Sequence, residues 1–435
     1  SLTFTARAAG EMRARLRGLG IPNASARTFH SAAIKQLMYF WPYAFGGSFP
    51  SLLTMKSGAI AEALNRTDSA LTPQTSTLRE IASEIEWAKV LEISPDEYVE
   101  SALGAGRTLR IPNNRPDKAN FEDISKVYQS YETLKQQERA IDFEDVLLLT
   151  VGMLEEDRDV RERVRDQYRY FTVDEYQDIS PIQQRLINAW LGSRKDICVV
   201  GDPAQTIYSF AGATPVFLNT FTQRFPEAEV IRLSTGYRST PEITFAANAL
   251  LRNSSMGQEL TASNDHGLHP SVDGYKDESA EIAGILKQIT DLLAEGTAPQ
   301  EIAILARTNS QLKGVERAMN SKGLPYQVRS TERFFDRPDV KEFLKGVRTA
   351  SVIPTEGINW LDELRTLAQP FLTGQSIDGI AGLLHLAREL DEDTNFTPKT
   401  LRSYLREVED RVQQNNPPTM PVITLATLHA AKGLE

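Results

Sequence analysis

The stretch that decides the fold reads YFTVDEYQD (170–178), PIQQRLINAWL (181–191) and ICVVGDPAQTIYSFAGA (197–213). Its two apolar runs, YFTV and ICVV, each stop abruptly at polar side chains. Short apolar runs bounded by turn signals are typical of strands buried on both faces of a parallel sheet. The segment between them has the apolar spacing of an amphipathic helix. The stretch therefore predicts a strand-helix-strand unit.

Polar side chains follow both predicted strands, and open α/β sheets bind ligands at the carboxyl ends of their strands. We therefore expect one crevice to bring together Asp174, Glu175, Asp178, Asp202 and Gln205. In nucleotide hydrolysis, one carboxylate holds Mg²⁺ while its neighbour orients or deprotonates the attacking water. Asp174 and Glu175 suit these roles, and Gln205 suits contact with a γ-phosphate. An Asp-Glu pair is also common in solvated turns, but its position after a buried strand favours the functional interpretation.

A chain of 435 residues exceeds what one hydrophobic core usually supports, so we expect several domains. Strand and helix patterns alternate over 278–329, and an apolar run follows at 422–425, which predicts a second parallel-sheet domain. Two stretches, 41–140 and 352–419, have helical patterns instead and predict helical insertions. The run AEVIRL at 228–233 predicts one further strand. The expected fold class is α/β.

Composition places the chain among ordinary soluble globular proteins, with 41% hydrophobic and 24% charged residues. No apolar run reaches the roughly 18 residues that span a bilayer, and no signal peptide opens the chain, so we expect a cytoplasmic protein without a membrane partner. The single cysteine, Cys198, excludes an internal disulfide and fits a reducing compartment. A net charge of −10 argues mildly against a general polyanion binder, although a local basic groove would not show in the total.

The first expected insertion contains a predicted helix over 119–139. Its apolar spacing predicts a buried stripe of four side chains, namely Phe121, Ile124, Val127 and Tyr131. The same insertion carries local positive charge from Lys89, Arg107, Arg110, Arg115 and Lys118. The ordinary cause of such a charge pattern is a solvated helical face.

Seven motifs follow one another along the chain: TFTARAAGEM (3–12), TFHSAA (28–33), DFEDVLLL (142–149), VDEYQD (173–178), VVGDPAQTIYSFAGA (199–213), GYRS (236–239) and TLHAAKGLE (427–435). In this order they resemble the UvrD/Rep/PcrA family of superfamily 1A DNA helicases, across nearly the whole chain. The wording TIYSFAGATP and the short second insertion most resemble the second UvrD-type helicase of actinobacteria.

The resemblance implies two RecA-like parallel-sheet domains, each with a helical insertion. The implied segments are 1–40 and 141–230 for domain 1A, 41–140 for insertion 1B, 231–351 and 420–435 for domain 2A, and 352–419 for a reduced insertion 2B. The implied activity is that of an ATP-dependent 3′-to-5′ DNA helicase or single-stranded DNA translocase of DNA repair and replication. ATP and Mg²⁺ would be its cofactors. Single-stranded DNA, duplex junctions and repair proteins would be its partners, in the cytoplasm at the nucleoid.

The resemblance also implies roles for single residues around ATP. Asp174 would bind Mg²⁺, Glu175 would activate water, and Gln205 would link the γ-phosphate to DNA. From the second domain, Tyr237 would stack on the adenine and Arg238 would reach the γ-phosphate. The ribose would lie near a residue of the last motif, Glu435.

On the DNA side, the resemblance implies a strand path lined by Phe4, Thr5, Thr28, His30, Tyr208, Phe210 and His429. Bases stack on aromatic faces, which suits Tyr208 and Phe210, although ordinary core packing also accounts for them. His30 fits DNA contact and the start of a helix equally well. Phe210 stands where the family usually has Trp, and Ala211 stands where it usually has Arg.

The 435 residues contain no GxxxxGK[ST] phosphate-binding loop and no Gly-Lys dipeptide. In the family this loop lies shortly before the first of the seven motifs, and an arginine motif lies after the last. Because the loop amides and lysine supply most triphosphate recognition, we expect a helicase fragment that does not hydrolyse ATP. Two alternatives stay open: a non-catalytic DNA-binding or partner-binding module, and the helicase part of a helicase–nuclease.

Overall fold

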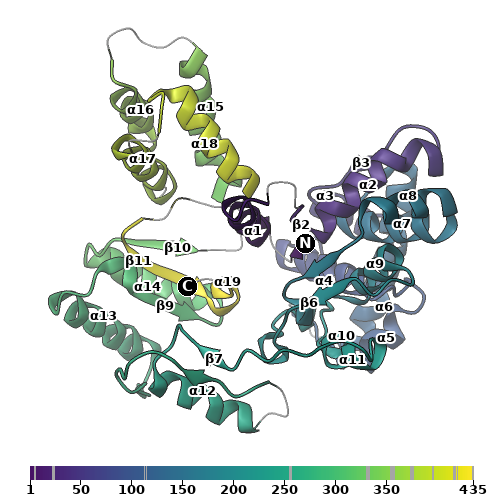
Figure 1. The fold of residues 1–435 in the computed structure, drawn as a ribbon, viewed down its shortest axis with the longest axis horizontal. Coiled ribbons are helices and arrows are strands. Elements are labelled where there is room, and N and C mark those ends of the chain that lie inside the picture. The colour runs from purple at the N-terminus through teal and green to yellow at the C-terminus, as the bar shows by residue number, and fades with distance from the viewer. Residues whose placement is uncertain are drawn as a thin grey trace. The chain divides into compact units, whose positions relative to one another are not determined.

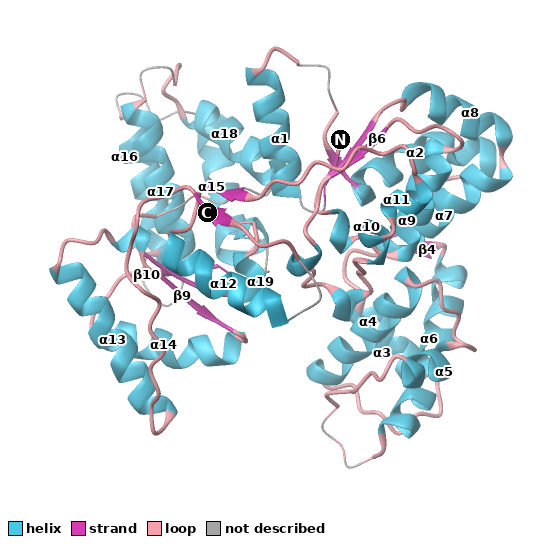
Figure 2. Cartoon of the chain, turned by 60° about the horizontal axis from the view of Figure 1, so that its bottom comes forward, coloured by secondary structure: helices cyan, strands magenta, loops and turns pink. Residues whose placement is uncertain are grey.

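The structure is a computed structural model of the whole chain. It describes residues 1–3, 6–21, 25–111, 113, 115–253, 257–329, 334–352, 358–372, 377–393, 396–414, 418 and 420–433. Contacts between residues divide the chain into two units, Ser1–Asp265 and His266–Glu435. Figure 2 shows short strands set among many helices. The fold is α/β with parallel sheets, as the sequence predicts.

The first unit is built on a parallel sheet whose strands lie in the order β2-β1-β5-β6. The strands are β1 (Leu2–Thr3), β2 (Arg27–Thr28), β5 (Phe171–Val173) and β6 (Ile197–Val199). In the register, Leu2 pairs with Val173, and Phe171 pairs with Ile197. The predicted strand-helix-strand unit is therefore present, with β5 and β6 as adjacent strands.

Helices cover this sheet: α1 (Ala6–Gly18), α2 (Phe29–Ala44), α7 (Phe143–Glu156), α8 (Arg158–Gln167), α9 (Pro181–Leu191), α10 (Val216–Asn219) and α11 (Phe221–Arg224). Helix α9 starts where predicted, because Ser180 and Gln183 form a capping box and Pro181 occupies its first position. At its other end, Trp190 stacks on Phe29 and Phe171, with ring centroids 6.4 and 6.0 Å away. These aromatic contacts join the strand-helix-strand unit to α2.

Two expectations for this region were wrong. Strand β6 is not buried on both faces, since Cys198 is exposed; β6 is the last strand in the sheet order and has a neighbouring strand on one side. Residues 228–233 form no strand in the structure, and Ile231 and Leu233 are 75% and 78% exposed. A strand forms only where a partner strand is available for pairing. In this stretch parallel pairing begins only at β7 (Thr235–Gly236), which pairs with β8 (Thr261–Ala262). Helix α12 (Pro241–Asn253) lies between these two strands in the chain.

The first helical insertion lies between α2 and α7 in the chain and has its own hydrophobic core. Its elements are β3 (Ser51–Leu52), α3 (Ser57–Asn65), α4 (Thr75–Val90), α5 (Tyr98–Gly104), α6 (Asp117–Glu138) and β4 (Ala140–Ile141). The predicted stripe of α6 is confirmed, because Phe121, Ile124, Val127 and Tyr131 are all fully buried.

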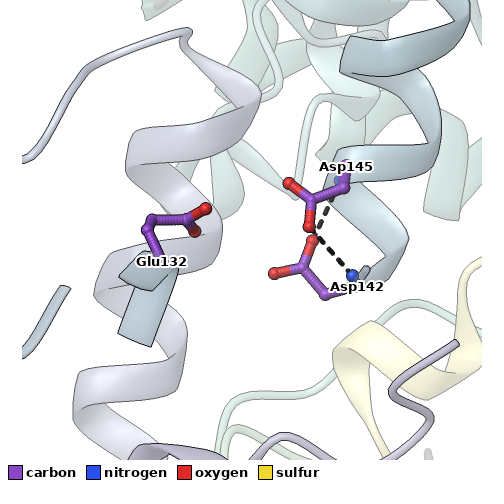
Figure 3. Close-up of side chains that lie close together, drawn as sticks. All are labelled: Glu132, Asp142 and Asp145. Carbon is purple, nitrogen blue, oxygen red and sulfur yellow. Dashed lines mark hydrogen bonds between the residues drawn. The ribbon is translucent and has the colours of Figure 1, made fainter. Parts of the chain in front are cut away.

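Buried charges attach this insertion to the sheet domain. The ammonium groups of Lys89 (α4) and Lys135 (α6) both bind Asp142 and Asp145 at the start of α7, with Lys89 Nζ 2.8 Å from Asp142 Oδ2. Lys89 is 2% exposed, and Asp142 is fully buried. The three carboxylates of Glu132, Asp142 and Asp145 lie close enough to hold a cation (Figure 3), but the ammonium groups of Lys89 and Lys135 already bind them and compensate two of their three negative charges. The cluster therefore forms an ionic link between the insertion and the start of α7.

Three basic side chains of the insertion form ion pairs with carboxylates instead of lying on a solvated helical face as expected. Lys89 belongs to the ionic link, Arg107 pairs with Glu84, and Arg115 pairs with Asp123. The carboxylate partners of Lys89 and Arg107 lie 53 and 23 positions away along the chain. Local charge patterns do not reveal pairs at such separations.

The second unit contains a three-stranded parallel sheet in the order β10-β11-β9. Its strands are β9 (Ala303–Ala306), β10 (Tyr326–Arg329) and β11 (Ile423–Thr427). Helices α13 (Glu278–Ala294) and α14 (Asn309–Ser321) lie beside this sheet (Figure 1), and a short helix, α19 (Leu428–Ala431), follows β11. Their shared core includes Leu286, Leu312 and Leu425.

A second helical subdomain with a separate core lies in this unit. It consists of α15 (Pro338–Val352), α16 (Trp360–Ala368), α17 (Ile377–Glu392) and α18 (Leu401–Gln414). Tyr404 of α18 is fully buried and donates its hydroxyl to the carbonyl of Leu383 at 2.9 Å. The core includes α15, so this subdomain extends further toward the N-terminus than the insertion expected at 352–419.

Among the described residues, no helix has the length and apolarity needed to cross a bilayer.

Replacing Lys89 with methionine should lower the free energy of unfolding by about 3–5 kcal/mol, because Asp142 would keep a buried charge with less compensation. Chemical denaturation measures the change. The control is Lys195→Met, which removes an exposed ion pair to Glu227 and should have a far smaller effect. Equal losses in the two variants would show that the buried charge of Asp142 does not need Lys89 to compensate it.

Candidate functional site

The two adjacent carboxylates of the site sit at the end of β5. The backbone N–H of Asp174 donates to the carbonyl of Leu2 at 3.0 Å, which continues the sheet pairing to this point. Glu175 then adopts a left-handed conformation, with φ 53° and ψ 43°. Few residues other than glycine adopt this conformation, and such strain is concentrated at functional sites. The left-handed turn ends the strand and starts the short helix Tyr176–Asp178.

A buried amide joins this strand end to the next. The Gln177 side chain donates from Nε2 to Oε2 of Glu175 at 2.5 Å, and its Oε1 accepts the backbone N–H of Asp202 at 3.0 Å. Gln177 is fully buried. A single side chain therefore sets the position of Glu175 relative to the end of β6. Sequence reasoning passed over Gln177, although its place between two acidic residues after a buried strand was the available signal.

Gly201 makes this bridge possible. A Cβ atom at residue 201 would lie 2.5 Å from Oε1 of Gln177 and 3.2 Å from the backbone nitrogen of Tyr176. That backbone nitrogen donates to the carbonyl of Val200 at 2.9 Å, so the two strand ends approach each other closely. Any larger residue would push the Gln177 amide away from the position it occupies.

Asp202 shapes the segment that follows β6. Its Oδ1 accepts the backbone N–H of Ala204 at 3.0 Å and caps the short helix Pro203–Gln205. Its Oδ2 accepts the side-chain amide of Gln205, also at 3.0 Å. Glu175, Asp202 and Gln205 are therefore connected through Gln177 and Asp202. The structure brings these predicted residues together at the carboxyl ends of β5 and β6.

Two aromatic side chains follow on the same segment. The rings of Tyr208 and Phe210 have centroids 6.3 Å apart and planes inclined by 51°. Phe210 is 54% exposed, so ordinary core packing does not account for it. Burial raises the pKa of Tyr208, and the negative charges of Asp178 and Glu175 raise it further. Tyr208 therefore lies within electrostatic reach of the carboxylate end of the site.

Thr28 and His30 both serve the start of α2. The hydroxyl of Thr28 accepts the backbone N–H of Ser31 at 3.2 Å and caps the helix. The His30 ring lies edge-on to Phe143, with centroids 6.0 Å apart. Burial and the nearby ammonium group of Lys56 lower the pKa of His30 to about 4. This geometry supports a role at the helix start, and DNA contact by these two residues stays a prediction.

The remaining predicted residues lie on other segments of the chain. Tyr237 is 75% exposed, and the carbonyl of Arg238 accepts the side-chain amide of Asn264 at 3.0 Å. In the second unit, His429 lies 3.4 Å from the Arg307 guanidinium, at the ends of the neighbouring strands β11 and β9. Sequence reasoning did not single out Arg307. The predicted residues Phe4, Thr5 and Glu435 lie outside the described residues.

Comparison with known families identifies the chain. Residues 1–226 match the UvrD/REP helicase N-terminal domain, and residues 231–350 match the UvrD-like helicase C-terminal domain. The chain belongs to the UvrD/REP helicase family. This confirms the resemblance drawn from the seven motifs, and both matched domains are of the RecA-like type.

The relatives include a protein of the second UvrD type. The chain is 41% identical over 458 aligned residues to the ATP-dependent DNA helicase UvrD2 of Mycobacterium tuberculosis, an alignment that covers 100% of this chain and 64% of the relative. It is 28% identical to the ATP-dependent DNA helicase PcrA of Staphylococcus epidermidis over 80% of this chain and 46% of that protein. The chain thus spans less than two thirds of the length of these helicases.

The lowered pKa of His30 predicts a pH-dependent stability. Between pH 6.5 and about 4 the unfolded chain binds a proton on this histidine that the folded chain does not, so the free energy of unfolding falls as the pH drops. The full loss is about 3 kcal/mol. Chemical denaturation of the wild type and His30→Gln at pH 7.5, 6 and 4.5 measures it. The variant should lose part of the pH dependence, and an identical dependence in both proteins would contradict the prediction.

Proposed function

We propose that the chain forms the motor region of an ATP-dependent 3′-to-5′ DNA helicase or single-stranded DNA translocase. The observation that carries this proposal is the connection from Glu175 through Gln177 and Asp202 to Gln205. It links the residue that would act on water with the residue that would sense a phosphate. Membership of the UvrD/REP helicase family and the helicase activity for which the relatives are named support the same conclusion.

The carboxylates at the end of β5 suit a magnesium nucleotide. Oxygen ligands from carboxylates are what Mg²⁺ prefers, and Asp174 would hold it. The ion would neutralise charge on the phosphate oxygens when bound. Glu175 would accept the proton of the attacking water at its carboxylate. The hydrogen bond from Gln177 to one Glu175 oxygen would restrict how this carboxylate turns while it does so.

Gln205 would connect nucleotide and DNA. It lies three residues before Tyr208 on a segment that Asp202 caps, so a shift of its amide toward a γ-phosphate would change the segment that carries the aromatic pair. Tyr237 would stack on the adenine, Arg238 would reach the γ-phosphate, and Glu435 would lie near the ribose.

Single-stranded DNA would lie over the aromatic pair, of which Phe210 is exposed and Tyr208 half-buried. Phe210 presents an exposed ring on which a base stacks with about 1–3 kcal/mol. The rest of the proposed strand path consists of Phe4, Thr5, Thr28, His30, Tyr208 and His429. Duplex junctions and repair proteins are the proposed partners of the whole protein, in the cytoplasm at the nucleoid.

One alternative is a non-catalytic DNA-binding or partner-binding module, which would bind single-stranded DNA without coupling it to ATP. The presence of Asp174, Glu175, Gln205 and Arg238 together favours the helicase over this alternative. The helicase part of a helicase–nuclease is the other alternative, and the sequence of the whole protein distinguishes it.

The 435-residue chain should show no DNA-stimulated ATP hydrolysis above background, since it lacks the loop that cradles the phosphates. Phosphate release in the presence of single-stranded DNA measures this. A longer form that includes a GxxxxGK[ST] loop is the positive control. Turnover by the 435-residue chain at the rate of the longer form would refute the expectation.

In that longer form, Glu175→Gln should abolish ATP hydrolysis while nucleotide binding is kept. The amide cannot take a proton from water but retains the size of the carboxylate. Binding of a fluorescent ATP analogue and steady-state phosphate release separate the two effects. Glu229→Gln, at an exposed position outside the site, is the matched control and should keep full turnover. Retained turnover in Glu175→Gln would remove this residue from its proposed role.

A further inference from the structure

Arg107 of the helical insertion is held rigidly by several partners. Its Nε lies 3.0 Å from both carboxylate oxygens of Glu84, and its guanidinium lies over the ring of Trp87, 4.3 Å from the centroid. Glu84 is 2% exposed and accepts the hydroxyl of the buried Tyr98 at 2.7 Å. These contacts fix the plane and direction of the guanidinium group, and the Arg107 side chain is 15% exposed.

The other side of this guanidinium reaches the segment with the aromatic pair. Nη1 of Arg107 donates to the backbone carbonyl of Phe210 at 3.2 Å, across 103 positions of sequence. A second contact supports the same segment, because helix α4 ends against Gly212. A Cβ atom there would lie 2.5 Å from Cγ2 of Val90, and Gly212 has a φ of 92° that favours glycine. The insertion thus holds this turn by a hydrogen bond and by close packing.

We propose that Arg107 is a positioning residue for the Tyr208–Phe210 pair. It fixes the backbone of the turn Ser209–Ala211, so that the exposed Phe210 ring faces a base of single-stranded DNA. The stacking role of Phe210 is part of the proposed function, and the inference rests on it. The helical insertion, through Arg107, thereby sets the orientation of the Phe210 ring toward the DNA and so the affinity for single-stranded DNA.

The chemistry requires arginine at this position. A guanidinium presents donors in a planar fork, so it binds Glu84 on one edge and a carbonyl on another. A lysine ammonium would keep the charge beside Glu84 but cannot hold both partners in a fixed geometry. Arg107→Lys therefore separates positioning from charge.

The experiment measures binding of a fluorescently labelled oligothymidylate to the 435-residue chain by anisotropy, without nucleotide. Phe210→Ala should raise the Kd by roughly fivefold or more through lost stacking. Arg107→Lys should raise it by about threefold or more. The double variant should bind within about a factor of two of Phe210→Ala alone. Once the Phe210 ring is removed, loss of its positioning by Arg107 has no further effect on stacking.

Arg115→Lys is the matched control, since Arg115 belongs to the same insertion and pairs with Asp123 instead of the aromatic segment. It should leave the Kd unchanged. Thermal melts establish that each variant is folded. If Arg107→Lys does not fold, Glu84→Gln replaces it. That variant loosens the anchor of Arg107 without removing a guanidinium donor, and it should weaken binding in the same non-additive way.

Three results would overturn the inference. If Arg107→Lys binds DNA as the wild type does while Phe210→Ala binds weakly, Arg107 has no positioning role and the proposed function stands. If the losses of the two single variants add in the double variant, Arg107 acts independently of the ring, as a direct phosphate contact would. If Phe210→Ala has no effect, the stacking role in the proposed function fails, and the inference fails with it.

Discussion

The site depends on one buried amide. Gln177 has no contact with solvent, yet it binds the carboxylate of Glu175 and the backbone N–H of Asp202 at once. Without it, the ends of β5 and β6 would each be an ordinary strand end with a polar turn. The close approach also requires glycine at position 201 and a left-handed backbone at Glu175. The strained backbone of Glu175 persists because the contacts from Gln177 and the neighbouring strand end hold it in place.

Helix α4 connects the insertion to two segments of the sheet domain, the aromatic turn and the start of α7. One part of it supplies Glu84 and Trp87, which hold Arg107 against the aromatic turn. Another supplies Lys89, which enters the buried ionic link at the start of α7. Buried ion pairs are poor sources of net stability because desolvation is costly, but breaking one is expensive, so they specify a single arrangement. The insertion is therefore placed by charge and not only by apolar packing.

Much of the fold was predictable because periodicity is a local property. The alternation of apolar runs and turns indicated parallel strands at β5, β6, β9 and β11, and the spacing on α6 identified its four buried side chains. The polar residues of the candidate site that follow the strands were predictable for the same reason. Polar residues that directly follow a buried strand, such as Asp174 and Glu175, must lie at the edge of the sheet.

Local sequence established most of the strands and helices and the polar groups that end them, although the strand expected at 228–233 is absent. Packing of the whole unit decided which polar groups, far apart in the chain, lie in contact with one another. Gln177 with Asp202, Arg107 with Phe210, and Lys89 with Asp142 are separated by 25, 103 and 53 positions. Packing also made β6 an edge strand with Cys198 exposed. A hydrogen bond or ion pair depends on distances within a few ångströms, and no local pattern in the sequence sets those distances.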